Sequence, residues 1–347
     1  MTAGHKIIFS GELNAMIMPF ENEAEINGTI RGLQFTPICP TCAVMTNIHA
    51  KKSLDNHVTV FQIDEKPVRG RAIHLGEAID KALGKDRYPP LVARYLGEAM
   101  MISALVARAL KFDGRLLVQC IGSNEGAISL LIADCTTQGH LRGYARFNEE
   151  QLKQIQLDNR NPGAKALFGK GTFSMTIDQG PDMDQYQCLA AVEGHALSDC
   201  AEHYFAQSEQ VPTRVKLACG TVQNEGEPAM WRGGGIMIQK IADDMAREDA
   251  GDAWKTAQAL FETVSDEELL DPDLSQDNLL YRLFHEDGVR VVQSADIKAQ
   301  CSCSAERLEN TLKSFDPAQV KDMAEDGVIT ATCEFCATHY RFDPNDF

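Results

Sequence analysis

The chain has 347 residues, of which 44% are apolar and 24% charged, so it is long and hydrophobic enough to fold as a globular protein of about two domains. Its 50 acidic residues outnumber its 33 basic ones, and the net charge of −17 disfavours binding to nucleic acid or to anionic membrane surfaces. Eleven cysteines are too few for a disulfide scaffold of this length, and their number is odd.

The N-terminus lacks the pattern of a secretion signal, because Glu12, Asn14 and Glu21 interrupt the apolar stretch that such a signal needs. No uncharged apolar run reaches the roughly 18 residues needed to span a bilayer, since the most apolar helix candidate carries Arg94 and Glu98. We therefore expect a cytoplasmic protein. In those reducing surroundings, clustered cysteines bind metal or react with oxidants rather than form static cross-links.

Residues 1–57 show no clear pattern and are expected to form an N-terminal extension of unknown role. The extension contains a C-x-x-C pair, Cys39 and Cys42, which resembles a thiol–disulfide active site. Too few residues accompany the pair to build a thioredoxin-like fold. The remaining interpretations are an accessory redox or metal-binding pair, an extension without function, or an assigned start that lies too far upstream.

Residues 58–240 are expected to form the core domain. Two helices are predicted from apolar residues at helical spacing, over 75–83 and, apolar nearly all round and therefore buried, over 91–110. A third helix is expected near 197–205. A period of two predicts an antiparallel meander and then further strands, at 115–121, 127–134, 141–147, 171–177, 185–192, 213–219 and 235–241. Strands mixed with helices without strict alternation indicate an α+β fold with antiparallel sheets packed on helices.

Residues 241–297 are expected to form an acidic helical linker. Positions 241–287 hold 14 acidic and three basic residues, a net charge of −11. Ser265 and Glu268 have the spacing of a capping box, and an apolar stripe comes after it, made of Leu279, Leu280, Leu283 and Phe284. Such weakly apolar, charged helices favour a marginal element that docks but is easily released. The alternative is an ordinary solvated acidic surface.

Residues 298–347 are expected to form a small C-terminal module. Ser304 is predicted to cap a first helix, and Pro317 to open a second one that Gly327 ends. Two short strands are then predicted, at 328–332 and 338–342. A unit this small buries too little apolar area to fold alone, so it needs a stabilising cross-link such as a metal ion or disulfides.

Two close cysteine pairs in this module can supply the cross-link: Cys301 with Cys303, and Cys333 with Cys336. Four thiolates make a tetrahedral Zn²⁺ site, and no fifth strong ligand is expected because His339 is assigned to the surface. The metal keeps the thiols deprotonated, so the same site is a store of thiolates that oxidants attack. A C-x-C disulfide is strained and therefore labile. Since such a site contributes about 10 kcal/mol or more to folding, oxidation is expected to unfold the module.

Other features weigh against rival functions. Five further cysteines lie in β or helical sequence patterns and are expected to be core side chains: Cys120, Cys135, Cys188, Cys200 and Cys219. The glycine cluster at 233–235 lacks the Lys-Ser/Thr of a phosphate loop, which disfavours ATP binding. Few basic residues in the module disfavour a zinc-ribbon nucleic-acid-binding protein. A zinc-dependent thiol–disulfide oxidoreductase would need an exposed pair free of metal. These two classes are the alternative functions.

The sequence resembles the heat-shock protein 33 family of redox-regulated holdase chaperones from about Val58 to Asp346. The resemblance rests on the two cysteine pairs with their spacing and on seven further segments in order: 111–114, 143–146, 204–205, 208–213, 234–237, 281–286 and 324–327. These read KFDG, GYAR, YF, SEQVPT, GGIM, YRLFHE and AEDG. Nothing in the family corresponds to residues 1–57.

The resemblance implies a cytoplasmic chaperone that is not an enzyme and uses no ATP. When reduced, it would hold one zinc ion through Cys301, Cys303, Cys333 and Cys336 and be inactive. Under oxidative stress it would form the disulfides Cys301–Cys303 and Cys333–Cys336, release zinc and unfold the module and linker. It would then form a homodimer and hold unfolding client proteins so that they do not aggregate.

Overall fold

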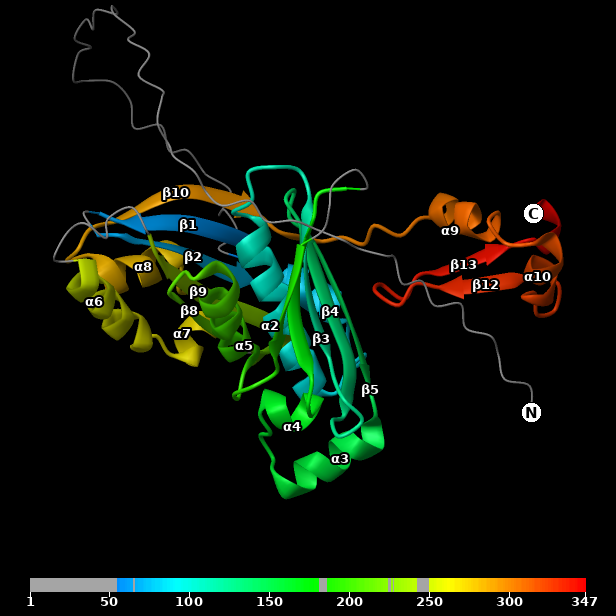
Figure 1. Cartoon of the computed structure of the whole chain (residues 1–347), viewed down its shortest axis with the longest axis horizontal. Coiled ribbons are helices and arrows are strands. Elements are labelled where there is room, and N and C mark those ends of the chain that lie inside the picture. Colours follow the sequence, from blue (N-terminus) through cyan, green and yellow to red (C-terminus); the bar gives the residue numbers. More distant parts are fainter. Residues whose placement is uncertain (1–54, 65, 181–185, 224–225, 227, 242–249) are drawn as a thin grey trace, which may run out of the picture.

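The computed structural model describes residues 55–64, 66–180, 186–223, 226, 228–241 and 250–347 (Figure 1). Two sheets dominate the described part. Sheet A has the strand order β10-β1-β2-β9-β8, and sheet B has the order β11-β5-β4-β3-β6-β7. The strands of sheet A are β1 (His57–Ile63), β2 (Val68–Leu75), β8 (Thr213–Val222), β9 (Met230–Lys240) and β10 (Val289–Asp296). Those of sheet B are β3 (Arg115–Ile121), β4 (Ile128–Thr136), β5 (His140–Phe147), β6 (Thr172–Asp178), β7 (Tyr186–Ala191) and β11 (Lys298–Ala299).

The predicted α+β class is confirmed. The three strands of the expected meander, β3, β4 and β5, are antiparallel neighbours, and β6 pairs with both β3 and β7. The predicted strands β8 and β9 are also antiparallel neighbours, in sheet A. In β5 the residues at 141, 143 and 145 face the core, so alternate residues present a row on the opposite face: Arg142, Tyr144 and Arg146.

Helix α2 (Pro90–Ala107) forms the centre of the core between the two sheets, as the prediction of a buried helix requires (Figure 1). Contrary to the sequence expectation, it reaches 18 residues with a mean hydropathy of 1.3, the length and hydropathy of a membrane span. Within the structure 83% of that segment is buried, which is typical of a core helix. The other helices of the core are α1 (Glu77–Leu83), α3 (Glu149–Asp158), α4 (Ala164–Phe168) and α5 (Leu197–Tyr204), the last continued by a π-helix (Phe205–Glu209).

The face of sheet A that points away from α2 is covered by three helices of the linker segment: α6 (Ala250–Glu262), α7 (Asp266–Leu270) and α8 (Gln276–Phe284). The capping box of Ser265 and Glu268 and the buried apolar stripe of α8 are both confirmed. Phe284 stacks on Phe61 of β1 with ring centroids 5.8 Å apart. The linker is therefore docked through a hydrophobic core of its own.

Two features at the edges of the expected segments were not predicted. Strand β10 lies within the segment assigned to the helical linker, yet it pairs with β1 at the edge of sheet A. Asp55 and Asn56, assigned to the extension, contact the core: Asp55 forms an ion pair with Arg232, and Asn56 Oδ1 accepts a hydrogen bond from the Ala78 amide at 3.0 Å. Cys39 and Cys42 lie outside the described residues.

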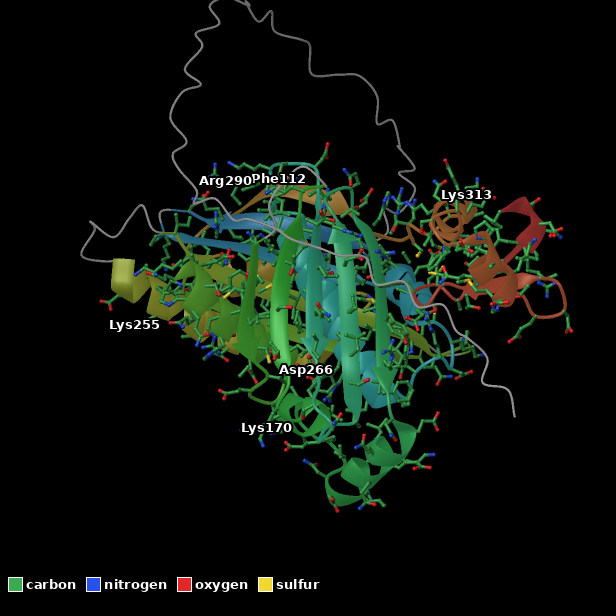
Figure 2. All side chains as sticks on the ribbon, turned by 45° about the vertical axis from the view of Figure 1, so that its right-hand side comes forward. Phe112, Lys170, Lys255, Asp266, Arg290 and Lys313 are labelled. Carbon is green, nitrogen blue, oxygen red and sulfur yellow. The ribbon has the colours of Figure 1, made fainter. Side chains whose placement is uncertain are left out.

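The C-terminal module contains α9 (Ala305–Leu312), α10 (Pro317–Asp322), β12 (Ile329–Thr332), β13 (His339–Phe342) and a final 3₁₀ turn (Pro344–Asp346). Its small core comprises Leu312, Val320, Ile329, Ala331 and Phe342. Ser304 caps α9 as predicted. The prediction that Gly327 ends the second helix is wrong, because α10 stops at Asp322 and Gly327 lies in a separate turn with φ +78°. In Figure 2, Lys313 of the module and Lys255 of α6 lie at opposite ends of the molecule.

Candidate metal centre

The two cysteine pairs are held by two different chain segments. Cys301 and Cys303 lie in the extended stretch after β11, ahead of the Ser304 cap. Cys333 and Cys336 lie in the tight turn between β12 and β13, which we call the knuckle (residues 333–336). The knuckle closes through an Ala337 amide that donates to the Cys333 carbonyl at 2.8 Å, with Ala337 in the left-handed region at φ +58°.

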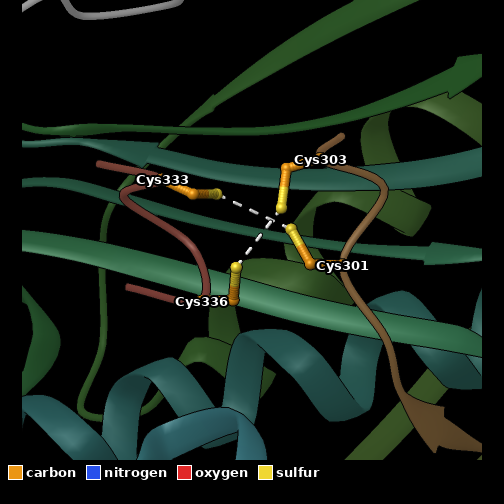
Figure 3. Close-up of side chains that lie close together, drawn as sticks. All are labelled: Cys301, Cys303, Cys333 and Cys336. Carbon is orange, nitrogen blue, oxygen red and sulfur yellow. Dashed lines mark hydrogen bonds between the residues drawn. The ribbon is translucent and has the colours of Figure 1, made fainter. Parts of the chain in front are cut away.

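The structure brings the four sulfur atoms together, each within 4.8 Å of the others (Figure 3). Two contacts cross between the pairs: Cys301 Sγ lies 3.7 Å from Cys333 Sγ, and Cys303 Sγ lies 3.4 Å from Cys336 Sγ. Tetrahedral zinc with Zn–S bonds of about 2.3 Å separates its sulfurs by about 3.8 Å. The donor set and its spacing therefore fit a four-thiolate Zn²⁺ site.

The thiols share protons across the pairs. The pKa of Cys301 is lowered to about 4, chiefly by the hydrogen bond that it shares with the Cys333 thiol and also by the Arg142 guanidinium beside it. The pKa of Cys333 is raised by the same bond. Burial raises the pKa of Cys303, although its sulfur accepts a hydrogen bond from the Tyr340 hydroxyl at 3.1 Å. The Arg142 guanidinium therefore favours the thiolate form of Cys301.

Beyond the four sulfurs, the module supplies polar groups at the knuckle. Cys336 Sγ lies 3.1 Å from the Thr338 hydroxyl. The prediction that His339 is a surface side chain is confirmed, since it is exposed and its Nδ1 lies 2.9 Å from the Thr332 hydroxyl.

The core domain also contacts the knuckle, through residues that the sequence analysis did not single out. The Arg87 guanidinium donates to the backbone carbonyls of Phe335, at 2.7 Å, and of Glu334. The Tyr144 hydroxyl donates to the Glu334 carboxylate at 3.1 Å. The Arg142 guanidinium lies 4.2 Å from the centre of the Phe335 ring. The alternation of the predicted strand 141–147 was the signal that could have placed the row of Arg142, Tyr144 and Arg146 on one face.

The remaining described cysteines lie away from this site. Four are buried in the core as predicted: Cys120, Cys135, Cys200 and Cys219. Burial raises the pKa of Cys135 to about 12 and that of Cys200 to about 11, which disfavours their thiolates. Cys188 is only half-buried, packs against the edge of the same core and lies 2.7 Å from the Ser208 hydroxyl.

Fold and site together define a class: an α+β protein of two sheets joined to a small module with four clustered thiols. The chain matches the family model described as Hsp33 protein over residues 56–343 and belongs to that family. It is 50% identical to the 33 kDa chaperonin of Caulobacter vibrioides (strain NA1000 / CB15N), over 84% of this chain and 96% of that protein. It is 34% identical to the 33 kDa chaperonin of Pseudomonas aeruginosa (strain UCBPP-PA14), over 82% and 91% respectively.

The fold is also similar to a solved structure. The crystal structure of the 33 kDa chaperonin (heat shock protein 33 homolog) from Thermotoga maritima superposes with a TM-score of 0.67 at 21% identity. The match covers 84% of this chain and 95% of that one. The likeness in fold therefore extends over most of the length of both chains.

Proposed function

We propose that the protein is a redox-regulated, ATP-independent holdase chaperone of the cytoplasm and not an enzyme. Reduced and zinc-bound, it is inactive. Oxidation joins Cys301 to Cys303 and Cys333 to Cys336, releases the zinc and unfolds the module and linker. The protein then forms a homodimer and holds unfolding client proteins so that they do not aggregate.

One observation carries the proposal: four thiols converge to within 4.8 Å of one another in a chain of the Hsp33 family, whose relatives are named chaperonins. Cys301, Cys303, Cys333 and Cys336 would hold the zinc ion, which supplies folding free energy to the module while it is bound. The core of the module consists of five buried apolar side chains with a few partly buried ones around them. So small a core supports the proposal that the module depends on the bound metal for its folding.

The division of the chain follows from this scheme. Residues 58–240 would be the chaperone core, 241–297 the linker and 298–347 the redox-switch module, with 1–57 as an extension of unknown role. The linker covers an apolar face of sheet A that includes Phe61, Ile236 and Ile238. Its release would uncover this face for clients, and its net negative charge would keep the complex dispersed in water.

The test is a light-scattering assay of an unfolding client, with zinc measured in the same samples. Reduced, zinc-loaded protein should leave aggregation unchanged. Oxidised protein should suppress aggregation and release about one zinc ion per chain. Suppression that does not depend on oxidation, or oxidation without zinc release, would contradict the proposal. Binding to nucleic acid by the reduced form, or catalytic turnover of disulfides, would instead favour one of the two alternative functions.

A further inference from the structure

Arg142 of β5 contacts both halves of the candidate metal centre. Its Nη1 lies 3.8 Å from Cys301 Sγ, in the first cysteine pair. The Cζ atom of the same guanidinium lies 4.2 Å from the centre of the ring of Phe335, a residue between Cys333 and Cys336 in the chain. Among the described core residues for which contacts with the module are seen, Arg142 is the one that contacts both segments carrying the cysteines.

Asp134 holds this guanidinium in place. The residue is directly opposite Arg142 on the neighbouring strand β4, and its Oδ2 accepts hydrogen bonds from Arg142 Nε and Nη2, both at 2.8 Å. Only 5% of the Asp134 side chain and 16% of the Arg142 side chain are exposed. Buried charge pairs with two hydrogen bonds keep a fixed geometry, so Arg142 is held with Nη1 beside Cys301 and Cζ over the Phe335 ring.

The charges of the site favour a cation at this position. Four thiolates carry two more negative charges than one Zn²⁺ neutralises. Arg142 lies beside Cys301, where its Nη1 is close enough to interact with a negatively charged sulfur. A fixed guanidinium there stabilises the thiolate and at the same time holds the knuckle through Phe335.

We propose that the Asp134–Arg142 pair is a positioning element that holds the two cysteine-bearing segments together and thereby sets how fast the module gives up its metal. This inference rests on the proposed function for the presence of zinc and goes beyond it in assigning part of the switch to the core domain. Loss of the pair leaves the four sulfurs in the protein but lets the two segments separate more often.

The experiment measures transfer of zinc from reduced, zinc-loaded protein to a chromophoric chelator. Residues that contact and orient metal ligands contribute about tenfold or more to metal affinity. We therefore expect Arg142→Met to release zinc about tenfold faster than wild type. Arg142→Lys should also release zinc faster, because an ammonium cannot donate to Asp134 and stack on Phe335 together. Asp134→Asn should act in the same direction, and the double variant Asp134→Asn with Arg142→Met should be no faster than Arg142→Met alone.

Arg115→Met is the matched control. Arg115 on β3 forms an equivalent cross-strand pair with Asp178 on β6, with Nε 2.8 Å from Oδ2, in the same sheet. This variant should release zinc at the wild-type rate. Equal rates for Arg142→Met and Arg115→Met would overturn the inference, as would additive effects of the Asp134 and Arg142 substitutions.

Hydrogen exchange and the zinc content of the wild-type protein distinguish failure of this inference from misfolding of a variant and from failure of the proposed function. The Lys298 amide donates to the carbonyl of Gly139, the residue before β5, and the Gln300 amide donates to the carbonyl of Leu141 in β5. Hydrogen exchange of these two amides should be faster in Arg142→Met while exchange in α2 is unchanged. Faster exchange confined to these amides excludes general misfolding of the variant. If Arg142→Met does not fold, the same measurements are made on Arg142→Lys. If wild-type protein holds no zinc, the proposed function itself fails, which differs from equal release rates among variants that all bind zinc.

Discussion

Gly234 of β9 lies directly beneath the backbone of Leu269 in α7. A Cβ atom at position 234 would collide with the carbonyl oxygen, carbonyl carbon and Cα of Leu269. Beside this contact, Arg232 Nε donates to the Leu270 carbonyl at 3.0 Å. Glycine at 234 therefore permits the linker to sit this close to sheet A.

Gly234→Ala should displace α7 and weaken docking of the linker, because backbone atoms cannot yield as a flexible side chain can. Overpacking of this kind costs about 1–3 kcal/mol. We expect the reduced, zinc-loaded variant to show faster hydrogen exchange in α7 and partial suppression of client aggregation without oxidation. Gly220→Ala on the adjacent strand is the control, because its Cβ would meet Leu270 Cδ1 at an ordinary 3.4 Å. Equal behaviour of the two variants would contradict this account.

Phe284→Ala should destabilise the linker more than the core. The ring is fully buried and stacks on Phe61, and removal of a buried phenylalanine costs about 3–5 kcal/mol. In a Trp231→Phe background, Trp254 in α6 is the remaining tryptophan and reports the linker. Its fluorescence should change at a lower urea concentration than the far-ultraviolet circular dichroism that follows the core. Tyr281→Ala on the same helix, where the side chain is 65% exposed, should leave a single transition.

Docking of the linker should weaken in acid because of His74. This residue is paired in register with Gly234, so it faces α7. It is 1% exposed, and neither ring nitrogen has a hydrogen-bond partner among the residues that the structure describes. Burial, chiefly, lowers its pKa from 6.5 to about 4. The charged and titratable groups that act on it are Asp55, Arg232, His57 and Asp271.

The sign of the pH effect is set by the lowered pKa. The stability that neutral His74 contributes is fully present above pH 6.5 and is lost as the pH falls towards 4, by about 2 kcal/mol at pH 5. His74→Leu should therefore flatten the fall in unfolding free energy between pH 7.5 and 5, measured by urea titration. Carboxylates and other histidines titrate in both proteins, so the difference between the two isolates His74. Parallel pH profiles of the two proteins would show that His74 does not contribute to the pH dependence of the unfolding free energy.

Oxidation should form disulfides within the close pairs, which peptide mapping by mass spectrometry of the oxidised protein detects. Disulfides between the pairs are the competing outcome, because close sulfur contacts also run from Cys301 to Cys333 and from Cys303 to Cys336. Cross-pair disulfides would join the knuckle to the segment after β11 and prevent their separation. Finding Cys301–Cys333 as the main product would exclude the proposed switch.

Much of the fold was predictable from local patterns. Alternation located β3 to β9, and the apolar content of 91–110 indicated the buried helix α2. Strand β10 was missed because it has no alternating apolar pattern: Val291 and Val292 are exposed and the strand is held by backbone pairing with β1. Pairing between segments more than 200 residues apart leaves no local trace.

The site was predictable in part for a similar reason. The spacing of the four cysteines marks them as one cluster, because each pair is local. Arg142 and Arg87 contact the module across 159 and 248 positions of sequence respectively, to Cys301 and Phe335. Nothing near either arginine in the chain indicates a partner so far away.

A single residue, Ile297, connects β10 to β11. Its side chain is buried and its amide donates to the Asn56 carbonyl at 2.7 Å, so the connection has no slack. One residue spans at most about 3.6 Å. Movement of β11 away from β5 by more than that distance must therefore begin to separate β10 from β1. A movement of β11 is therefore transmitted through one residue to β10, the edge strand of sheet A, whose other face the linker helices cover.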